Sequence, residues 1–413
     1  MKSGRVAGID VHKSMLAVAV GSADLKEDEF EYNRFGTTRA ELRRMADWLT
    51  DQGVTEVVME STAQYWKTVW LELETRFPLS LAQARSVRGP KGRKSDLRDA
   101  ARLVRRLLSK DLVLSYVPAA EQRKWRLLTR TRVQMVNPLP RLTSRIEGVL
   151  EEGRMKLSCY WSDLLGLTGR RILEALAEGQ CDAEELVKLV DPRMQASRED
   201  LAAALEGGLG AAERTVLQAF LEQVRMVELH IQKLEREAGA LLQPHQETIA
   251  RWCEIPGIHV TAAQQIVAEL GPAAGVFDSP AQLASWIGCC PGRQESAGES
   301  QSERSAKGNW AMRRLLAPIA WASSRTKDCI FQDRFRRWVP RLGVQKALWA
   351  LAHRICRVIW IVLHRGEGYI EHGVRGKNPA AVRHRAQQLI RGLRRCGYSV
   401  QVTADGAIVG IPG

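Results

Sequence analysis

The chain has 413 residues, of which 45% are hydrophobic and 26% are charged, and this composition excludes disordered, collagen-like and fibrous proteins. At about 150 residues per domain, this length predicts two or three domains. The formal net charge of +14 is unevenly distributed, because residues 304–413 contain 21 Lys and Arg against 5 Asp and Glu, whereas residues 1–303 contain 40 against 42. A basic block of this size favours a polyanionic partner, most often nucleic acid.

The sequence also argues against secretion and against a membrane partner. No apolar run approaches the roughly 20 residues that span a bilayer. Asp10, His12 and Lys13 interrupt the apolar N-terminus, which argues against a signal peptide. The eight cysteines show no CxxC pair and no zinc-ligand spacing, so we expect free thiols in a reducing cytoplasm.

The first 118 residues predict an α/β domain. Apolar runs predict strands at 6–9, 15–20, 55–59 and 78–83, and helical patterns predict helices at 38–51, 64–76 and 95–108. Leu42, Met45, Ala46 and Leu49 form the apolar face of the first helix. Strands that alternate with helices favour a mixed sheet flanked by helices.

Residues 119–250 are predicted to be helical. The sequence Asn137-Pro138-Leu139-Pro140 must break a helix, because proline lacks the N–H group and restricts the residue before it. Apolar residues from Leu217 to Leu241 alternate at spacings of three and four, which predicts a coiled coil over about 213–242 and a contact between subunits. The alternative is one amphipathic helix packed on the core of its own domain.

Residues 251–365 predict a second compact, mostly helical domain, and residues 366–413 predict a basic extension. We expect a helix near 379–395 in this extension, followed by strands at 398–403 and 407–411. The segment 254–259 resembles a helix-hairpin-helix turn, in which the N-terminus of the second helix offers N–H groups to a phosphate. His259 stands where such a turn usually has glycine.

Four carboxylates stand where a metal site could form. Asp10 follows the first predicted strand, Glu60 ends the third, and Asp96 and Asp99 begin a helix on which they share one face. Oxygen clusters of this kind bind Mg²⁺ or Mn²⁺, and a pair of such ions can clamp a phosphoryl transfer. The layout is that of ribonuclease H-like folds, and the ten Arg and Lys of residues 85–110 suit a phosphate backbone. The alternative is that each acid is a turn or helix-cap residue.

Ser296 lies in a loop rich in glycine and serine, ahead of a basic helix. A serine must be activated before it acts as a nucleophile, and nearby arginines with a bound metal could do this for a phosphodiester. No Ser-His-Asp arrangement and no GxSxG motif is legible, so acyl chemistry is disfavoured. The alternative is an ordinary polar loop serine.

Five motifs, in this order, resemble the insertion sequence 110 family of transposases, also called DEDD or bridge-RNA-guided serine recombinases: GIDVHK, VVMEST, GRKSDLRDA, IPGIHVTAAQQIVAELG and CPGRQESAG. The likeness runs from about residue 5 to residue 373. It implies a RuvC-like (ribonuclease H-like) N-terminal domain in which Asp10, Glu60, Asp96 and Asp99 bind Mg²⁺, with Mn²⁺ as a substitute. It also implies that Ser296 attacks a DNA phosphodiester to form a phosphoserine link, which a 3′-hydroxyl then resolves on the partner strand.

The same resemblance implies the partners. These are donor and target double-stranded DNA, a structured non-coding guide RNA from the element, and further copies of the chain in a dimer to tetramer. The setting would be the bacterial cytoplasm, at the nucleoid when DNA is bound. The expected nucleic-acid contacts are Arg88, Lys91, Arg93, Lys94, Arg293, Arg304, Lys307, Arg313 and Arg314. Members usually carry an uninterrupted basic helix where this chain has residues 137–140, and His259 is a second departure.

Two other functions fit part of the sequence. A structure-specific nuclease of the Holliday-junction-resolvase kind would use the same acids with water as the nucleophile, so that Ser296 would be dispensable. A non-catalytic nucleic-acid-binding protein would fit the coiled coil and the basic tail, but it would leave the ordered acidic motifs without a role. Substitution of Asp10 or Asp99 by Asn separates this last function from the two catalytic ones.

Overall fold

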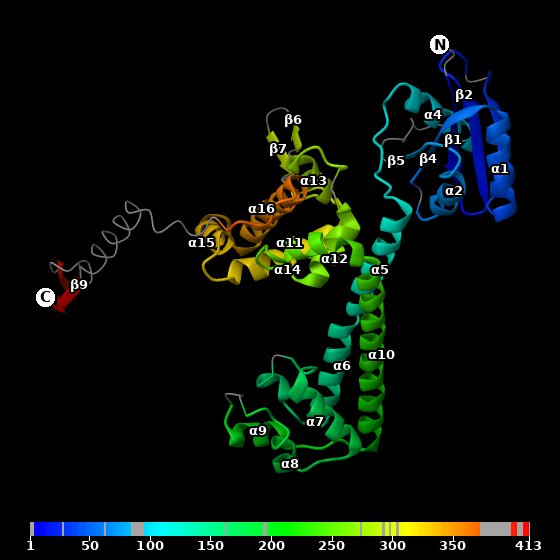
Figure 1. The fold of residues 1–413 in the computed structure, drawn as a ribbon. Coiled ribbons are helices and arrows are strands. Elements are labelled where there is room, and N and C mark those ends of the chain that lie inside the picture. The colour runs from blue at the N-terminus through cyan, green and yellow to red at the C-terminus, as the bar shows by residue number, and fades with distance from the viewer. Residues whose placement is uncertain are drawn as a thin grey trace. The chain divides into compact units, whose positions relative to one another are not determined.

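The chain divides into two compact units, Met1–Ala119 and Ala120–Gly413, which are described separately (Figure 1). The structure is a computed structural model. It describes residues 4–26, 29–61, 63–83, 95–161, 163–192, 196–272, 275–290, 294–296, 299–302, 305–371, 398–402 and 408–412.

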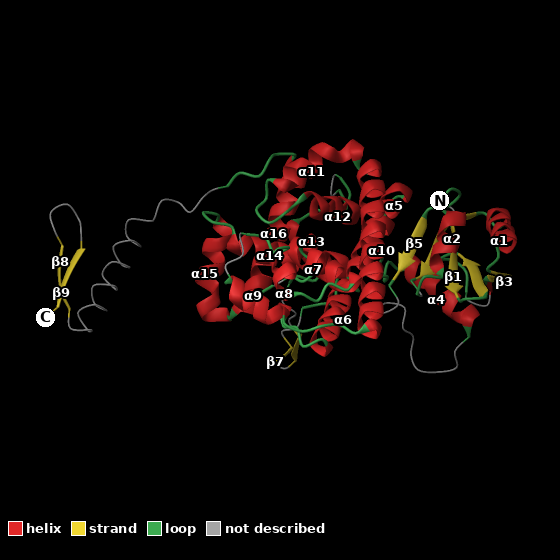
Figure 2. Cartoon of the chain, turned by 90° about the horizontal axis from the view of Figure 1, so that it is seen from below, coloured by secondary structure: helices red, strands yellow, loops and turns green. Residues whose placement is uncertain are grey.

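A five-stranded mixed sheet forms the centre of the first unit (Figures 1 and 2). Its strands are β1 (Arg5–Val11), β2 (Met15–Gly21), β3 (Glu31–Gly36), β4 (Val54–Glu60) and β5 (Leu79–Ala82), in the spatial order β3-β2-β1-β4-β5. The pairs β1–β2 and β2–β3 are antiparallel, whereas β1–β4 and β4–β5 are parallel. The four predicted strands are confirmed, and β3 is an addition that the sequence pattern did not predict.

Helices cover both faces of this sheet. Helices α1 (Arg39–Asp51) and α2 (Trp66–Leu73) pack on the face that carries Ala7, Ile9 and Val11, and α4 (Asp96–Leu108) packs on the opposite face. The three predicted helices are therefore confirmed. The predicted apolar face of α1 is buried as expected, and the Thr38 side chain caps this helix by accepting the Glu41 N–H. A mixed sheet with helices on both faces gives the first unit the predicted α/β architecture.

The second unit is built mainly of helices. They are α5 (Ala120–Val136), α6 (Leu139–Glu152), α7 (Leu167–Glu178), α8 (Ala183–Val187), α9 (Arg198–Leu205), α10 (Ala211–Leu241), α11 (Gln246–Cys253), α12 (Val260–Leu270), α13 (Pro280–Ile287), α14 (Trp310–Arg325), α15 (Ile330–Leu342) and α16 (Val344–Arg365). Short 3₁₀ turns occupy Leu157–Cys159 and Gln243–His245. The predicted break at residues 137–140 is confirmed, since α5 ends at Val136 and α6 begins at Leu139.

The long helix α10 packs against α5, α6 and α7 of the same chain. Leu217, Val224 and Ala238 of its heptad pattern are buried, and the intervening heptad residues are half-buried. Ion pairs join the helices along the seam, with Arg132 Nε 2.6 Å from Glu235 Oε1. The heptad pattern therefore forms an intramolecular seam, and a contact between subunits stays a prediction.

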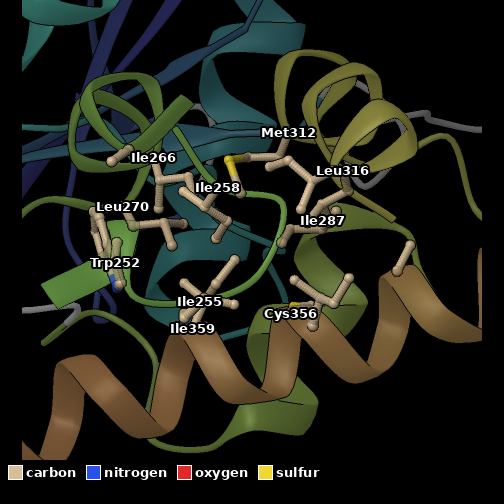
Figure 3. Close-up of a cluster of buried hydrophobic side chains, with 14 of the residues drawn as sticks. Trp252, Ile255, Ile258, Ile266, Leu270, Ile287, Met312, Leu316, Cys356 and Ile359 are labelled. Carbon is tan, nitrogen blue, oxygen red and sulfur yellow. The ribbon is translucent and has the colours of Figure 1, made fainter. Parts of the chain in front are cut away.

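Helices α11 to α16 enclose the largest hydrophobic core (Figure 3). Trp252, Ile258, Ile266 and Leu316 fill its interior, and Ile359 of α16 completes it. By length and composition alone α16 could cross a membrane, but one whole face of it is buried in this core, which marks it as a core helix.

Two antiparallel strand pairs complete the second unit. They are β6 (Gln294–Ser296) with β7 (Glu299–Ser302), and β8 (Tyr398–Val402) with β9 (Ile408–Pro412). The second pair confirms the strands predicted at the C-terminus, and the helix expected near 379–395 lies outside the described residues. The cysteines within the described residues are free, as expected.

Candidate functional site

The register of the sheet brings two of the four predicted acids together. Ile9 of β1 pairs with Met59 of β4, so the next residues, Asp10 and Glu60, lie side by side near the ends of parallel strands. Side chains alternate between the faces of a strand. Val58 packs toward α4, and therefore Glu60, two residues further on, shares that face. Asp10 shares it as well, because Ala7, Ile9 and Val11 point to the other side.

A glycine in β1 allows α4 to come close to this face. A Cβ atom built on Gly8 would lie 2.2 Å from the carbonyl oxygen of Ala100, so any side chain there would push α4 away. Asp96 and Asp99 occupy the first turn of α4, directly after Ser95, the N-cap residue. Close packing of this helix over β1 thus carries both carboxylates toward Asp10.

Asp10, His12 and Asp96 form a compact group in which one ligand atom from each residue lies within 4.8 Å of the others. His12 Nε2 is 3.1 Å from Asp10 Oδ2 and 3.5 Å from Asp96 Oδ1. Asp99 lies beside this group, with its Oδ1 2.5 Å from Arg102 Nη1 one turn along α4. These side chains can supply oxygen and nitrogen ligands to one divalent cation.

The electrostatics of the group also suit a cation. Asp10 is only 8% exposed. Burial raises the pKa of the Asp10 carboxyl above its ordinary value; His12 opposes this rise, and the charges of Asp96 and Asp99 add to it. A buried carboxylate with two acidic neighbours is stabilised by any positive charge that binds between them.

His12 was missed as a site residue by the sequence analysis. The signal was present, because His12 stands two residues after Asp10 and continues the alternation of Gly8 and Asp10 toward α4. The same residue also interrupts the apolar N-terminal segment, and this is the only role that the sequence pattern gave it. The structure places it at the turn between β1 and β2, where its N–H donates to the Met15 carbonyl at 3.0 Å.

Ser296 lies in a short hairpin of the second unit. It is the last residue of β6 and pairs with Glu299 at the start of β7. Ser296 was expected in a loop rich in glycine and serine, whereas the structure has it at the end of β6, paired with β7. Polar strands of this length lack the apolar alternation by which strands are recognised, and their mutual backbone pairing forms the hairpin.

The base of this serine hairpin is closed by contacts between its two ends. The Asn309 N–H donates to the Trp286 carbonyl at 3.0 Å. The Arg313 guanidinium donates to the carbonyls of Gly288 and Ala306, and it lies over the Trp349 ring at 4.5 Å from the ring centroid. Arg313 thus ties the chain entering the hairpin to the chain leaving it.

A buried carboxylate connects this base to α5. Glu269 of α12 is fully buried and accepts two hydrogen bonds from Arg130 of α5, at 2.6 and 2.8 Å. Asn309 donates its side-chain N–H to the same carboxylate at 3.1 Å while its own oxygen caps α14. Arg126 donates to the main-chain carbonyls of Ala268 and Glu269. This Glu269 network holds α5, α12 and α14 together.

The predicted nucleic-acid residues divide into three groups. Lys307 and Arg314 are exposed, and Arg313 is engaged at the hairpin base. The remaining ones lie outside the described residues: Arg88, Lys91, Arg93, Lys94, Arg293 and Arg304. 

A helix-hairpin-helix turn was predicted at residues 254–259. In the structure, α11 and α12 are joined there by a tight turn. Gly257 has φ +87° in this turn and faces α14, where the Ser323 hydroxyl donates to the Pro256 carbonyl at 2.6 Å. The turn is therefore packed on α14 on its glycine side, and phosphate binding at the α12 N-terminus stays a prediction.

Two family models match the chain. A transposase model of the IS110 DEDD type matches residues 7–154, which include the four acids. A model described as the transposase IS116/IS110/IS902 family matches residues 250–336, which include Ser296, Glu269 and Asn309. No curated protein matches the sequence.

Proposed function

The chain belongs to the IS110 family of transposases, and on this premise we propose that it joins donor and target DNA of an insertion element through a phosphoserine intermediate at Ser296. The family supports a transposase or recombinase activity in general, and its DEDD type implies a divalent metal. The proposal adds the nucleophile, the metal ligands and the guide. A RuvC-like fold is consistent with the DEDD family name and with the mixed sheet of the first unit.

The observation that carries the proposal is the convergence of Asp10 and Asp96 on one face of β1. We assign Asp10, Glu60, Asp96 and Asp99 as the tetrad that binds Mg²⁺, with Mn²⁺ as a substitute. When bound, the cation supplies positive charge that stabilises the phosphodiester as it is cleaved. The buried Asp10 carboxylate and its acidic neighbours fit such an ion in charge and in ligand chemistry.

The chemical step is assigned to Ser296. Its Oγ forms a bond to phosphorus while the bond from phosphorus to the 3′-oxygen breaks, and the serine proton is transferred to the departing 3′-oxygen. A 3′-hydroxyl of the partner strand then attacks the same phosphorus, and Oγ leaves with a proton. The phosphodiester bonds are conserved throughout, so the reaction needs no external energy source.

The partners follow from the family and from charge. We propose that exposed basic residues such as Lys307 and Arg314 contact phosphate groups. These two residues lie before and after the first residue of α14, the helix that follows the serine hairpin. A structured guide RNA from the element would pair with both DNAs, and a homo-oligomer of two to four chains would bring the sites together.

A covalent-trapping assay tests this function. Purified protein, candidate guide RNA and end-labelled donor DNA are incubated with Mg²⁺ and separated on a denaturing gel. We expect a labelled protein–DNA adduct with the wild type and none with Ser296→Ala. The matched control is Ser285→Ala, which changes an exposed serine of α13 away from the hairpin base.

Two results would redirect the assignment. Free DNA ends without an adduct, produced equally by Ser296→Ala, would establish a metal-dependent nuclease that uses water. DNA binding without cleavage, unchanged in Asp99→Asn, would establish a non-catalytic binding protein. Both catalytic functions require that Asp99→Asn abolish cleavage while DNA binding persists.

A further inference from the structure

We propose that His12 is a direct ligand of the divalent cation, so that the site combines one imidazole nitrogen with carboxylate oxygens. This inference rests on the proposed function, because it concerns the cation held by Asp10 and Asp96. The imidazole Nε2 lies 3.1 Å from Asp10 Oδ2 and 3.5 Å from Asp96 Oδ1. Nε2 is thus close to an oxygen of each of the two carboxylates.

The backbone holds His12 at this point. β1 ends at Val11 and β2 begins at Met15, so His12 starts a short turn whose first N–H donates to the Met15 carbonyl. Thr37 fixes the other side of the turn by donating its hydroxyl to the Lys13 carbonyl at 3.1 Å. A residue anchored in this way presents its side chain with little loss of conformational entropy on binding.

The distances match neighbouring ligands around one ion. Ligand atoms at about 2.1 Å from an octahedral cation, when they occupy adjacent positions, lie about 3 Å apart. The two distances from Nε2, 3.1 and 3.5 Å, are both close to that value, and all three ligand atoms lie within 4.8 Å of one another. The His12 side chain is 46% exposed, so water can complete the coordination shell.

A nitrogen ligand changes the metal that the site prefers. Imidazole suits transition metals, whereas Mg²⁺ is bound mainly by carboxylate, carbonyl and water oxygens. A site with His12 as a ligand should therefore favour Mn²⁺ over Mg²⁺ more strongly than a site of carboxylates alone. Without the imidazole, this preference should fall.

The competing interpretation is that His12 is only a counter-ion, which pairs with the two carboxylates and must leave before a cation binds. The two roles predict opposite effects of removal. A ligand contributes to affinity, so His12→Ala should weaken Mn²⁺ binding by about ten-fold or more. A counter-ion competes with the cation, so its removal should strengthen binding.

The test uses the full-length protein with Mn²⁺ alone as the probe, without nucleic acid. Free Mn²⁺ is titrated by electron paramagnetic resonance, and pulsed measurements detect coupling of the bound ion to nitrogen. The variants are His12→Ala, the more conservative His12→Asn, and His230→Ala as a control on the exposed face of α10. Circular dichroism melting confirms that each variant is folded.

Nitrogen coupling in the wild type and in His230→Ala, lost together with affinity in both His12 variants, is the expected result. Unchanged or tighter Mn²⁺ binding in His12→Ala would overturn the inference. Asp10→Asn then separates this failure from that of the proposed function. If Asp10→Asn abolishes Mn²⁺ binding and His12→Ala does not, the acidic site stands and only the role of His12 is refuted. Absence of Mn²⁺ binding to the wild type would refute both.

Discussion

Substitution of Glu269 by alanine should destabilise the second unit strongly. The change removes a fully buried carboxylate that accepts two hydrogen bonds from Arg130 and one from Asn309. Arg130 and Arg126 both lose the carboxylate that pairs with them, while Arg126 keeps its main-chain acceptors. Breaking one side of a buried ion pair costs about 3–5 kcal/mol. The Arg130 side chain is 30% exposed and can be rehydrated, and Arg126, which is 12% exposed, keeps its main-chain hydrogen bonds. We therefore expect the lower end of this range, about 3 kcal/mol.

Urea unfolding of the full chain, followed by tryptophan fluorescence, measures this effect. Nine of the twelve tryptophans lie in the second unit, so the signal reports mainly on it. Glu269→Gln keeps one acceptor oxygen and should cost less, about 1.5 kcal/mol. The matched control is Asp333→Asn, which removes an ion pair to Arg337. Because the Arg337 side chain is 72% exposed, this substitution should cost less than about 1 kcal/mol. If Glu269→Ala cost no more than this control, the Glu269 network would not hold the helices together.

Three further predictions follow from the packing and charge of the described residues. Gly8→Ala should destabilise the first unit by about 1–3 kcal/mol and weaken Mn²⁺ binding, because the new Cβ would lie 2.2 Å from the Ala100 carbonyl oxygen. Gly148→Ala is the control: a Cβ there has nothing within 4 Å, so this change should stabilise α6 by about 0.5–1 kcal/mol in the same urea assay. The pKa of Asp10 is raised in the folded state, so folding favours its protonated form and its ionisation destabilises the fold as pH rises. Asp10→Asn should therefore raise the Tm in EDTA at pH 7, and this gain should shrink toward pH 4; a gain that grew on acidification would contradict the sign. Leu217→Ala, at a buried heptad position, should cost about 2–5 kcal/mol, whereas Leu229→Ala, at a 54% exposed position of α10, should change the unfolding free energy by less than about 0.5 kcal/mol. Equal costs for these two variants would show that the seam of α10 does not lie where the structure has it.

Local patterns were sufficient to predict most of the first unit. Apolar runs located β1, β2, β4 and β5, and helical periodicity identified the buried face of α1. β3 has only Phe35 buried and forms the edge of the sheet, so nothing in its own sequence distinguishes it from a loop. Its strand conformation arises from pairing with β2, which a local pattern does not contain.

The candidate site was predictable in part for the same reason. The acids could be found because each stands at the end of a local element, and the pairing of β1 with β4 then brings Asp10 beside Glu60. The role of His12 depends on which face of β1 meets α4, and this is decided by tertiary packing. The Glu269 network joins residues 139 positions apart in the sequence, so no local pattern could reveal it.

The closed base of the serine hairpin makes the hairpin a separate unit that can be exchanged as a whole. Because Arg313 and the Asn309–Trp286 hydrogen bond join its two ends, the base of the hairpin is held by residues outside β6 and β7, whereas Cys289 at this base is buried in the hydrophobic core. Apart from Ser296, the residues of the two strands can therefore differ among related elements while the helices that carry them stay the same. The hairpin is also a natural unit to exchange in engineering, since the hydrogen bonds at the base come from residues that the exchange would leave in place.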